Sequence, residues 1–279
     1  MNFSSPVLSI EIDGHVATLW LDRPEKRNAM SHELWSNLRP AIDAIAAEPE
    51  VRAVVLAGRG KSFCVGIDLG DLGNQPAAGD DRGAGKTSGA LANLRQMEVT
   101  RAFQDAITAV AECPLPVVAA IHSHCLGAGI DLVTACDIRL ASQDATFGVR
   151  ETKIGIVADV GTLQRLPGIV GDGHVAELAY TGKDIDAKRA EKIGLVNDVY
   201  EDAAAVQAAA LAMAEDIAAN APLAVRGTKF ILRQSEELTT EQSLLLNGLW
   251  TMATTLNSND LMEAMSAFME KRPAKFSGS

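Results

Sequence analysis

The order of short apolar segments along this 279-residue chain is the feature that most restricts its fold. Over the first 200 residues, short runs rich in Val, Ile, Leu and Ala alternate with segments of helical apolar spacing. This alternation predicts an α/β fold. After about residue 200 the apolar pattern is wholly helical. We therefore expect an α/β core over residues 1–200 and a helical region over residues 201–279.

The individual elements follow from local signals. Asp13-Gly14 separates two strand-like runs and predicts a hairpin, and Ser31 is placed to cap the helix that follows. Strands are predicted at residues 7–12, 15–21, 53–57, 117–121, 138–141 and 195–199. Helices are predicted at residues 97–111, 127–135, 203–219, 223–233, 239–255 and 258–271. Residues 70–89 carry no hydrophobic period and are predicted to form a mobile surface loop without helix or strand.

The charge balance limits the classes of partner. There are 25 Lys and Arg residues against 36 Asp and Glu residues, a net charge of −11, which opposes binding to nucleic acid. No stretch approaches the roughly 18 consecutive apolar residues of a membrane span, and the N-terminus lacks the pattern of a secretion signal. We expect an acidic protein of the cytoplasm, with no membrane span and no nucleic-acid partner.

Two kinds of site are excluded by spacing. The stretches AGRGKS and GAGKT resemble a phosphate-binding P-loop, but Val55 and Asp80 stand where that motif needs glycine. His122 and His124 lie near Cys125, yet no third ligand follows at a recognisable distance, so no metal is expected. The four cysteines form no CxxC pair and are expected to be buried thiols.

Three segments together form a candidate catalytic site. Residues 61–69 follow a strand with a glycine-containing turn, and residues 125–137 place small residues where a strand gives way to a helix. Bare N–H groups at a helix N-terminus and on a glycine turn can hold one oxygen from two sides, which makes an oxyanion hole. In the third segment, residues 147–167, Glu151 and Asp159 lie among apolar neighbours, a setting that raises the pKa of carboxyl groups.

Four motifs together resemble the crotonase, or enoyl-CoA hydratase/isomerase, superfamily. They are RPEKRNAM from Arg23, SFCVGIDL from Ser62, LGAGIDLVTACDIR from Leu126 and GTLQRLP from Gly161. The resemblance extends over residues 7–276. It implies a crotonase-like spiral of ββα units, and a helical C-terminal region that joins subunits into homotrimers or hexamers of two trimers.

The resemblance also implies the ligand and the residues that bind it. The substrate would be an acyl-CoA, with no further cofactor, and its thioester oxygen would accept hydrogen bonds from the N–H groups of Ile67 and Ala128. Family members usually carry glycine at the second position, but Ala128 supplies the same N–H. The residues expected to bind substrate are Lys26, Arg27, Val65, Gly66, Asp68, Leu69 and Gly129. Phe268, Lys271 and Phe276 are further candidates that would act from a neighbouring subunit; the alternative interpretation is that they are a solvated charge and helix-packing aromatics.

Three acids distinguish the reactions of the superfamily. Hydratases similar to this chain have an acid, commonly Glu, at the position of Asp131 and a Glu at the position of Glu151. At the position of Asp159 they usually have Gly. The trio resembles Δ3,5-Δ2,4-dienoyl-CoA isomerases. By that resemblance Asp159 would take the C2 proton, Glu151 would protonate C6 and Asp131 would orient and polarise.

Other interpretations stay open at this stage. The chain could be a 2-enoyl-CoA hydratase or a Δ3-Δ2-enoyl-CoA isomerase that tolerates Asp159, or a silent acyl-CoA-binding protein. Each acid also has a structural interpretation: Asp131 in the first turn of a helix, Glu151 in a surface ion pair, and Asp159 as a helix cap.

Overall fold

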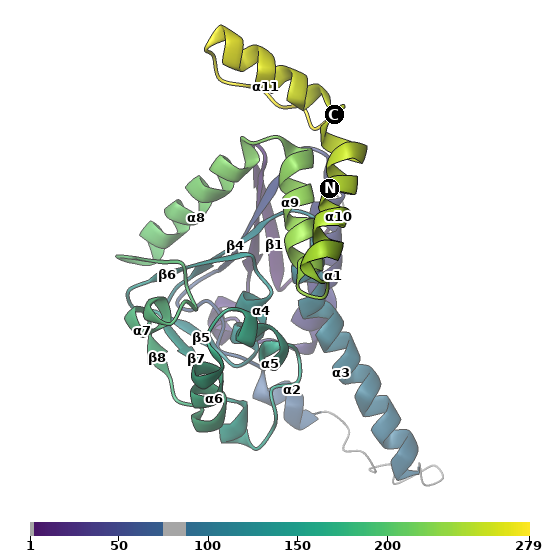
Figure 1. Cartoon of the computed structure of the whole chain (residues 1–279). Coiled ribbons are helices and arrows are strands. Elements are labelled where there is room, and N and C mark those ends of the chain that lie inside the picture. Colours follow the sequence, from purple (N-terminus) through teal and green to yellow (C-terminus); the bar gives the residue numbers. More distant parts are fainter. Residues whose placement is uncertain (1–2, 75–87) are drawn as a thin grey trace.

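The computed structural model describes residues 3–74 and 88–279, which form two sheets surrounded by helices (Figure 1). The larger sheet has the order β1-β2-β3-β4-β6-β9. Its strands are β1 (Leu8–Asp13), β2 (Val16–Leu21), β3 (Ala53–Gly58), β4 (Val117–Ile121), β6 (Ile138–Ser142) and β9 (Asp198–Tyr200). The smaller sheet joins β5 (His124–Leu126), β7 (Thr146–Gly148) and β8 (Ile185–Asp186).

The predicted hairpin opens the larger sheet. β1 and β2 pair antiparallel around Gly14, whose φ of +54° suits a glycine, and all other pairs in this sheet are parallel. Every residue of β2, β3 and β4 is buried, as expected for parallel strands covered on both faces. The α/β prediction is confirmed.

The core is built from three similar turns of the chain, each with one strand in the larger sheet. The second and third turns each add a strand to the smaller sheet, and the first reaches it through an isolated bridge at Cys64. In the second turn β4 is followed by β5 and by α4 (Ala128–Thr134); in the third, β6 is followed by β7 and the 3-10 helix η2 (Glu151–Ile154). The first turn runs from β3 through Cys64 to α2 (Leu69–Asn74).

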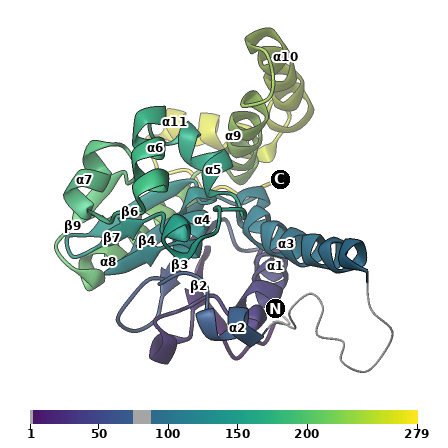
Figure 2. The same ribbon diagram turned by 90° about the horizontal axis from the view of Figure 1, so that it is seen from below.

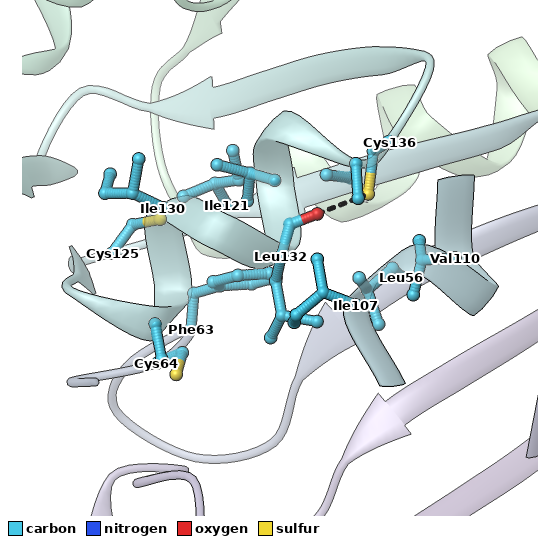
Figure 3. Close-up of a cluster of buried hydrophobic side chains, with 14 of the residues drawn as sticks. Leu56, Phe63, Cys64, Ile107, Val110, Ile121, Cys125, Ile130, Leu132 and Cys136 are labelled. Carbon is cyan, nitrogen blue, oxygen red and sulfur yellow. Dashed lines mark hydrogen bonds between the residues drawn. The ribbon is translucent and has the colours of Figure 1, made fainter. Parts of the chain in front are cut away.

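Cys64, Cys125 and Phe147 mark the same position in these three turns. Cys64 forms an isolated parallel bridge with Cys125, and Cys125 is in register with Phe147. All three side chains are buried, and Figure 3 shows Cys64 and Cys125 in the core beside Phe63 and Ile130. We call these three residues the register row.

Helices cover both faces of the larger sheet. α1 (His32–Ala46) packs against α3 (Gly89–Glu112) on one side, and α8 (Ala203–Ala218) covers β3 and β4 on the other through its small buried residues. The remaining helices are the 3-10 helices η1 (Pro24–Lys26) and η3 (Leu166–Gly168), then α5 (Thr162–Arg165), α6 (Asp172–Thr181), α7 (Ala187–Lys192), α9 (Pro222–Ser235), α10 (Thr240–Trp250), the π-helical segment η4 (Thr251–Thr255) and α11 (Asn259–Glu270). The N-terminal half of α3 and all of α11 project from the body (Figures 1 and 2).

The C-terminal helices are tied to the core by buried polar contacts. On α9 the Lys229 ammonium donates to the Asp137 carboxylate at 2.6 Å and to the Leu115 carbonyl at 2.9 Å. The Arg52 guanidinium donates to the Phe276 carbonyl at 2.9 Å, which places the tail near the beginning of β3. The helical character of the last third is confirmed, whereas the domain boundary at residue 200 stays a prediction.

Several predicted elements need correction. β5, β7 and β8 were not predicted, because segments of two or three residues carry no readable period. α3 begins eight residues before the predicted start at residue 97, where Ser88 caps it by accepting from Leu91 N at 3.3 Å. The predicted loop over residues 70–89 is wrong at both ends, since α2 extends to Asn74 and α3 starts at Gly89; residues 75–87 lie outside the described residues.

Within residues 3–74 and 88–279, no single helix has the length and apolarity needed to cross a membrane. The consecutive helices α8 and α9 meet that criterion only when joined, and they are bent by 108°.

Candidate active site

Two backbone N–H groups without partners lie at corresponding places in the first two turns of the spiral. Ile67 stands three residues after Cys64, and Ala128 three residues after Cys125. Ala128 is the first residue of α4, so its N–H has no acceptor within the helix. In the described part of the chain neither amide donates a hydrogen bond. The two predicted oxyanion-hole donors are therefore brought together on adjacent segments.

A glycine with positive φ precedes each donor. Gly66 has φ +96° and Gly127 has φ +52°, and a Cβ atom on Gly127 would lie 3.6 Å from the Cα atom of Gly66. On Gly66 a Cβ atom would come within 3.0 Å of the Leu126 carbonyl oxygen. These positions allow the two turns to approach closely, and other residues are disfavoured there.

Asp131 lies one helical turn after Ala128 and is fully buried. Its Oδ1 atom accepts a hydrogen bond from the Thr162 N–H at 2.6 Å, while Oδ2 is buried without a hydrogen-bond partner. Burial raises the pKa of Asp131 to about 6, against the lowering effect of the hydrogen bonds from Thr162. The carboxyl group is thus fixed by one oxygen and leaves the other free.

Glu151 begins η2 in the third turn and is also buried, with its Oε2 atom lacking a hydrogen-bond partner. The other oxygen, Oε1, lies 3.6 Å from the position of a Cβ atom on Gly127, so the carboxyl group faces the turn that presents the Ala128 amide. Burial, together with the charges of Asp131 and Asp159, raises the pKa of Glu151 to about 7.

Asp159 has an exposed side chain on the loop before α5. Its backbone carbonyl accepts from the Gln104 side chain at 2.7 Å, which fastens this loop to α3. The carboxylate acts electrostatically on both other acids, raising the pKa values of Asp131 and Glu151. The structure therefore gathers all three predicted acids, two buried and one open to solvent.

The structural interpretations of Glu151 and Asp159 do not describe this arrangement. The arginine next to Glu151, Arg150, forms its ion pair with Asp184 instead. The residue in the cap position of α5 is Gly161, not Asp159. For Asp131 the helix position is as expected, in the first turn of α4, and burial sets it apart from an ordinary surface acid.

The residues predicted to bind substrate divide into three groups. Lys26 and Arg27 are exposed on and just after η1, and Leu69 is exposed at the start of α2. Val65 and Gly66 belong to the strand-like segment next to the register row. The other two predicted residues make contacts of their own inside the fold: Asp68 pairs with Arg23 at 3.1 Å, and a Cβ atom on Gly129 would lie 3.0 Å from the Cys64 carbonyl oxygen.

Two contributors were missed from the sequence. Gly127 sets the conformation before Ala128, and Thr162 holds Asp131 through its backbone N–H. Gly127 begins a run of small residues just before a buried helix. It could have been identified from that run, because a turn into a buried helix favours glycine. The Thr162 contact joins residues 31 positions apart and has no local signal.

Comparison with known proteins agrees with the fold. Residues 11–279 match the family model described as enoyl-CoA hydratase/isomerase. A relative from Arabidopsis thaliana named peroxisomal Δ3,5-Δ2,4-dienoyl-CoA isomerase is 41% identical over 95% of this chain and 93% of its own length. The mitochondrial protein of that name from Mus musculus is 40% identical over 94% of this chain and 78% of its own length. The crystal structure of an enoyl-CoA hydratase from Bacillus anthracis superimposes with a TM-score of 0.88 at 29% identity, covering 98% of this chain and 100% of the other.

The expected cytoplasmic location is corrected by these relatives. Their names place them in the peroxisome or the mitochondrion. Composition and charge led to the wrong expectation because a compartment is specified by a short address that a receptor reads, and the folded domain carries no physical trace of it.

The described geometry, the family model and the relatives agree. This chain belongs to the enoyl-CoA hydratase/isomerase family and has the crotonase-like fold.

Proposed function

We propose that this protein is a Δ3,5-Δ2,4-dienoyl-CoA isomerase. The observation that carries the proposal is the presence of three mutually interacting carboxyl groups, those of Asp131, Glu151 and Asp159, beside two unpaired backbone N–H groups. The relatives of 40–41% identity that bear this name support it.

In the proposed reaction, the substrate's thioester oxygen accepts hydrogen bonds from the Ile67 and Ala128 amides. Negative charge grows on that oxygen when a proton leaves C2, and preformed N–H donors stabilise the charge without reorganising. Each such donor contributes about 3 to 4 kcal/mol to lowering the barrier.

The two proton transfers occur at opposite ends of the diene. Asp159, as a carboxylate, takes the proton from C2, and the electron pair of that C–H bond forms the C2–C3 double bond. The C3–C4 pair moves to C4–C5, and the C5–C6 pair takes a proton from Glu151 at C6. No atom is gained or lost. Two acids are needed because C2 and C6 lie too far apart for one carboxyl group to serve both.

The environments of the acids suit these roles. With a pKa of about 7, Glu151 retains its proton in a substantial fraction of molecules near neutral pH and can donate it. The side chain of Asp159 is exposed on the loop before α5, within electrostatic reach of the other two acids. Asp131, held by Thr162, would orient the substrate and polarise it.

The exposed cations Lys26 and Arg27 would bind the phosphates of coenzyme A, and the backbone of residues 65–69 would bind the rest of the acyl-CoA. Gly129 on α4 packs closely against Cys64, the residue just before this segment. Because every step is a proton transfer or a hydrogen bond, the proposed reaction needs no cofactor or metal beyond the coenzyme A of the substrate.

A hydratase is the second candidate. Asp131 and Glu151 each have one buried oxygen without a partner, an arrangement that could bind and activate water. A relative from Thermus thermophilus named putative enoyl-CoA hydratase is 36% identical over 94% of this chain. Asp159 is the residue that separates the two candidates.

We also propose that the protein assembles through its C-terminal helices. Large apolar side chains of these helices are exposed in the single chain: Leu232, Leu244, Leu245, Leu249, Met252, Leu256, Met262, Met265, Phe268 and Met269. Large apolar side chains exposed in one region of a single chain indicate a contact between proteins. A trimer, or two stacked trimers, would cover these side chains, and sedimentation equilibrium measures which one forms.

The experiment that tests the function is a pair of assays on the purified protein. One follows the absorbance of a conjugated thioester as 3,5-dienoyl-CoA is converted, and the other follows hydration of a 2-enoyl-CoA. Fast conversion of the diene, lost in Asp159→Asn, would support the isomerase. Dominant hydration that survives Asp159→Gly would establish the hydratase instead, and inactivity in both assays with retained acyl-CoA binding would favour a binding protein.

A further inference from the structure

The segment around Ile67 is held by the segment of residues 23–30. The Met30 N–H donates to the Gly66 carbonyl at 2.8 Å, and the Asp68 N–H donates to the Met30 carbonyl at 3.0 Å. In this parallel bridge the residue between the two contacts, Ile67, turns its own N–H away from Met30. The direction of the candidate oxyanion donor is thus set by contacts on both sides of it.

An ion pair lies directly beside this bridge. The guanidinium of Arg23 donates to the Asp68 carboxylate at 3.1 Å and to the Ala29 carbonyl at 2.6 Å. Asp68 also accepts from the Gly70 N–H at 3.0 Å. The two side chains are only 15% and 18% exposed, so solvent screens their interaction less than that of a surface pair.

Asn28 completes the connection. Its side chain is fully buried, accepts from the Arg23 N–H at 2.9 Å and donates to the Arg59 and Ser62 carbonyls at 2.9 and 2.8 Å. These carbonyls belong to the loop that leads from β3 to the register row. We call Arg23, Asn28 and Asp68 the brace.

We propose that Arg23 and Asp68 are positioning residues, whose ion pair keeps the Ile67 N–H aimed at the thioester oxygen. This inference rests on the proposed function, because it assigns a role within the same oxyanion hole. It also gives Asp68 a part different from direct substrate binding.

The two donors of the oxyanion hole have different surroundings, which explains why only Ile67 needs an ion pair beside it. Ala128 begins a helix whose seven residues are all buried, so core packing fixes its amide. Ile67 lies in a segment that is half-buried, and Leu69 just after it is 59% exposed. Polar contacts must therefore supply the rigidity that packing supplies around Ala128.

The chemistry of the pair favours arginine. Its planar guanidinium reaches the Ala29 carbonyl with one nitrogen and Asp68 with another, and a lysine ammonium cannot match that fork. A displacement of the amide by about 1 Å is enough to reduce turnover about 100-fold.

The test compares Arg23→Gln, Asp68→Asn and the double variant with the wild-type protein in the dienoyl-CoA assay. We expect kcat to fall about 10- to 100-fold in each single variant, with KM changed less than threefold. The double variant should lose no more than the worse single one, because both changes break the same contact. Arg39→Gln removes an exposed arginine that pairs with Glu112 at 3.6 Å, and it serves as the matched control with unchanged kcat.

A spectroscopic measurement separates positioning from general loss of structure. Isotope-edited infrared spectra of a bound saturated acyl-CoA report how strongly the thioester carbonyl is polarised. In the wild-type protein we expect the stretching frequency to be lowered on binding, and in Arg23→Gln and Asp68→Asn to be lowered less, with unfolding midpoints close to the wild-type value.

The outcomes distinguish the two proposals. If the wild-type protein neither converts the diene nor shifts the carbonyl frequency, the proposed function fails. If the wild-type protein does both and the variants match it in kcat and frequency, or if they lose affinity alone, the positioning role is overturned.

Discussion

The brace and the pair of acids Asp131 and Glu151, here called the acid pair, are both built from buried or partly buried polar side chains, yet they differ in how the hydrogen-bonding atoms of those side chains are satisfied. Asn28 makes hydrogen bonds with both its oxygen and its nitrogen, and Asp68 is held by Arg23 and Gly70. In contrast, Asp131 and Glu151 each keep one buried oxygen without a partner.

The difference shows in the electrostatics. Burial alone would raise the pKa of Asp68, but the hydrogen bonds from Arg23 and Gly70 lower it below its ordinary value. For Asp131 and Glu151 burial prevails and the pKa values are raised to about 6 and about 7. One group of polar residues is arranged to hold the backbone, and the other is left free to exchange protons.

The largest expected effect concerns activity at the acid pair. Glu151→Gln removes the proposed donor to C6, so kcat for 3,5-dienoyl-CoA should fall about 10²- to 10⁴-fold. In contrast, the stability of this variant relative to the wild-type protein should increase as the pH rises. Because the pKa of Glu151 rises from 4.5 to about 7 on folding, the wild-type protein loses stability as the pH rises between these values, and the glutamine variant is spared that loss.

Thermal unfolding at pH 4.5 and pH 8 measures this contrast. The midpoint of Glu151→Gln relative to wild type should be higher at pH 8 than at pH 4.5. The exposed Glu201→Gln is the control and should change neither activity nor the pH trend. A glutamine variant that is uniformly less stable would contradict the view that this carboxyl group is free for chemistry.

The next effect concerns the turn at Gly127, which precedes the Ala128 amide. Gly127→Ala places a side chain on a backbone with φ +52° and ψ −119°, which residues other than glycine rarely adopt. The added methyl group has room, so the strain lies in the backbone, and we expect the turn to move and carry the Ala128 amide with it. We expect kcat to fall about 10²- to 10³-fold. Gly171→Ala, at φ −63° with open space around it, should leave the rate unchanged. A normal rate in both variants would show that the Gly127 turn does not set the oxyanion hole.

A stability effect is expected in the brace. Asn28→Ala removes three hydrogen bonds made by a fully buried side chain and should cost about 3 kcal/mol of unfolding free energy. Asn37→Ala, which removes one exposed hydrogen bond on α1, should cost less than about 0.5 kcal/mol. Urea unfolding of both variants measures the difference, and equal costs would abolish the distinction between the two groups.

The smallest effect is a shift of the pH profile. If Glu151 donates its proton, kcat/KM should fall tenfold per pH unit above about pH 7. The charge of Asp131 raises the pKa of Glu151, so in Asp131→Asn this decline should begin at lower pH. If the decline begins at the same pH in Asp131→Asn as in the wild-type protein, the two carboxyl groups titrate independently.

The sequence predicted the elements that are long or have strong local signals. The hairpin at Gly14, the buried strands β3 and β4, and the cap at Ser31, whose hydroxyl accepts from Leu34 N at 3.3 Å, are confirmed. The start of α3 was predicted too late because its first two turns are largely exposed and need no apolar period.

Prediction of the candidate site from the sequence extended to the acids proposed to perform the chemistry but not to the residues that hold the site in place. Asp131, Glu151 and Asp159 were identified through their resemblance to a family, and the structure brings them within electrostatic reach of one another. The contact of Asp68 with Arg23 joins residues 45 positions apart. Such contacts depend on where the turns of the spiral meet, and no periodicity in the sequence encodes that.

The register row has a consequence for insertions and deletions. Ile67 and Ala128 lie at the same distance along the chain from their members of the row, Cys64 and Cys125. Adding one residue within either interval would displace that amide by about 3.3 Å, the rise of one residue in a strand, and would separate it from its counterpart. Length can therefore vary between successive turns, where a connection only returns the chain to the sheet, but within a turn the spacing from row to functional group must stay constant.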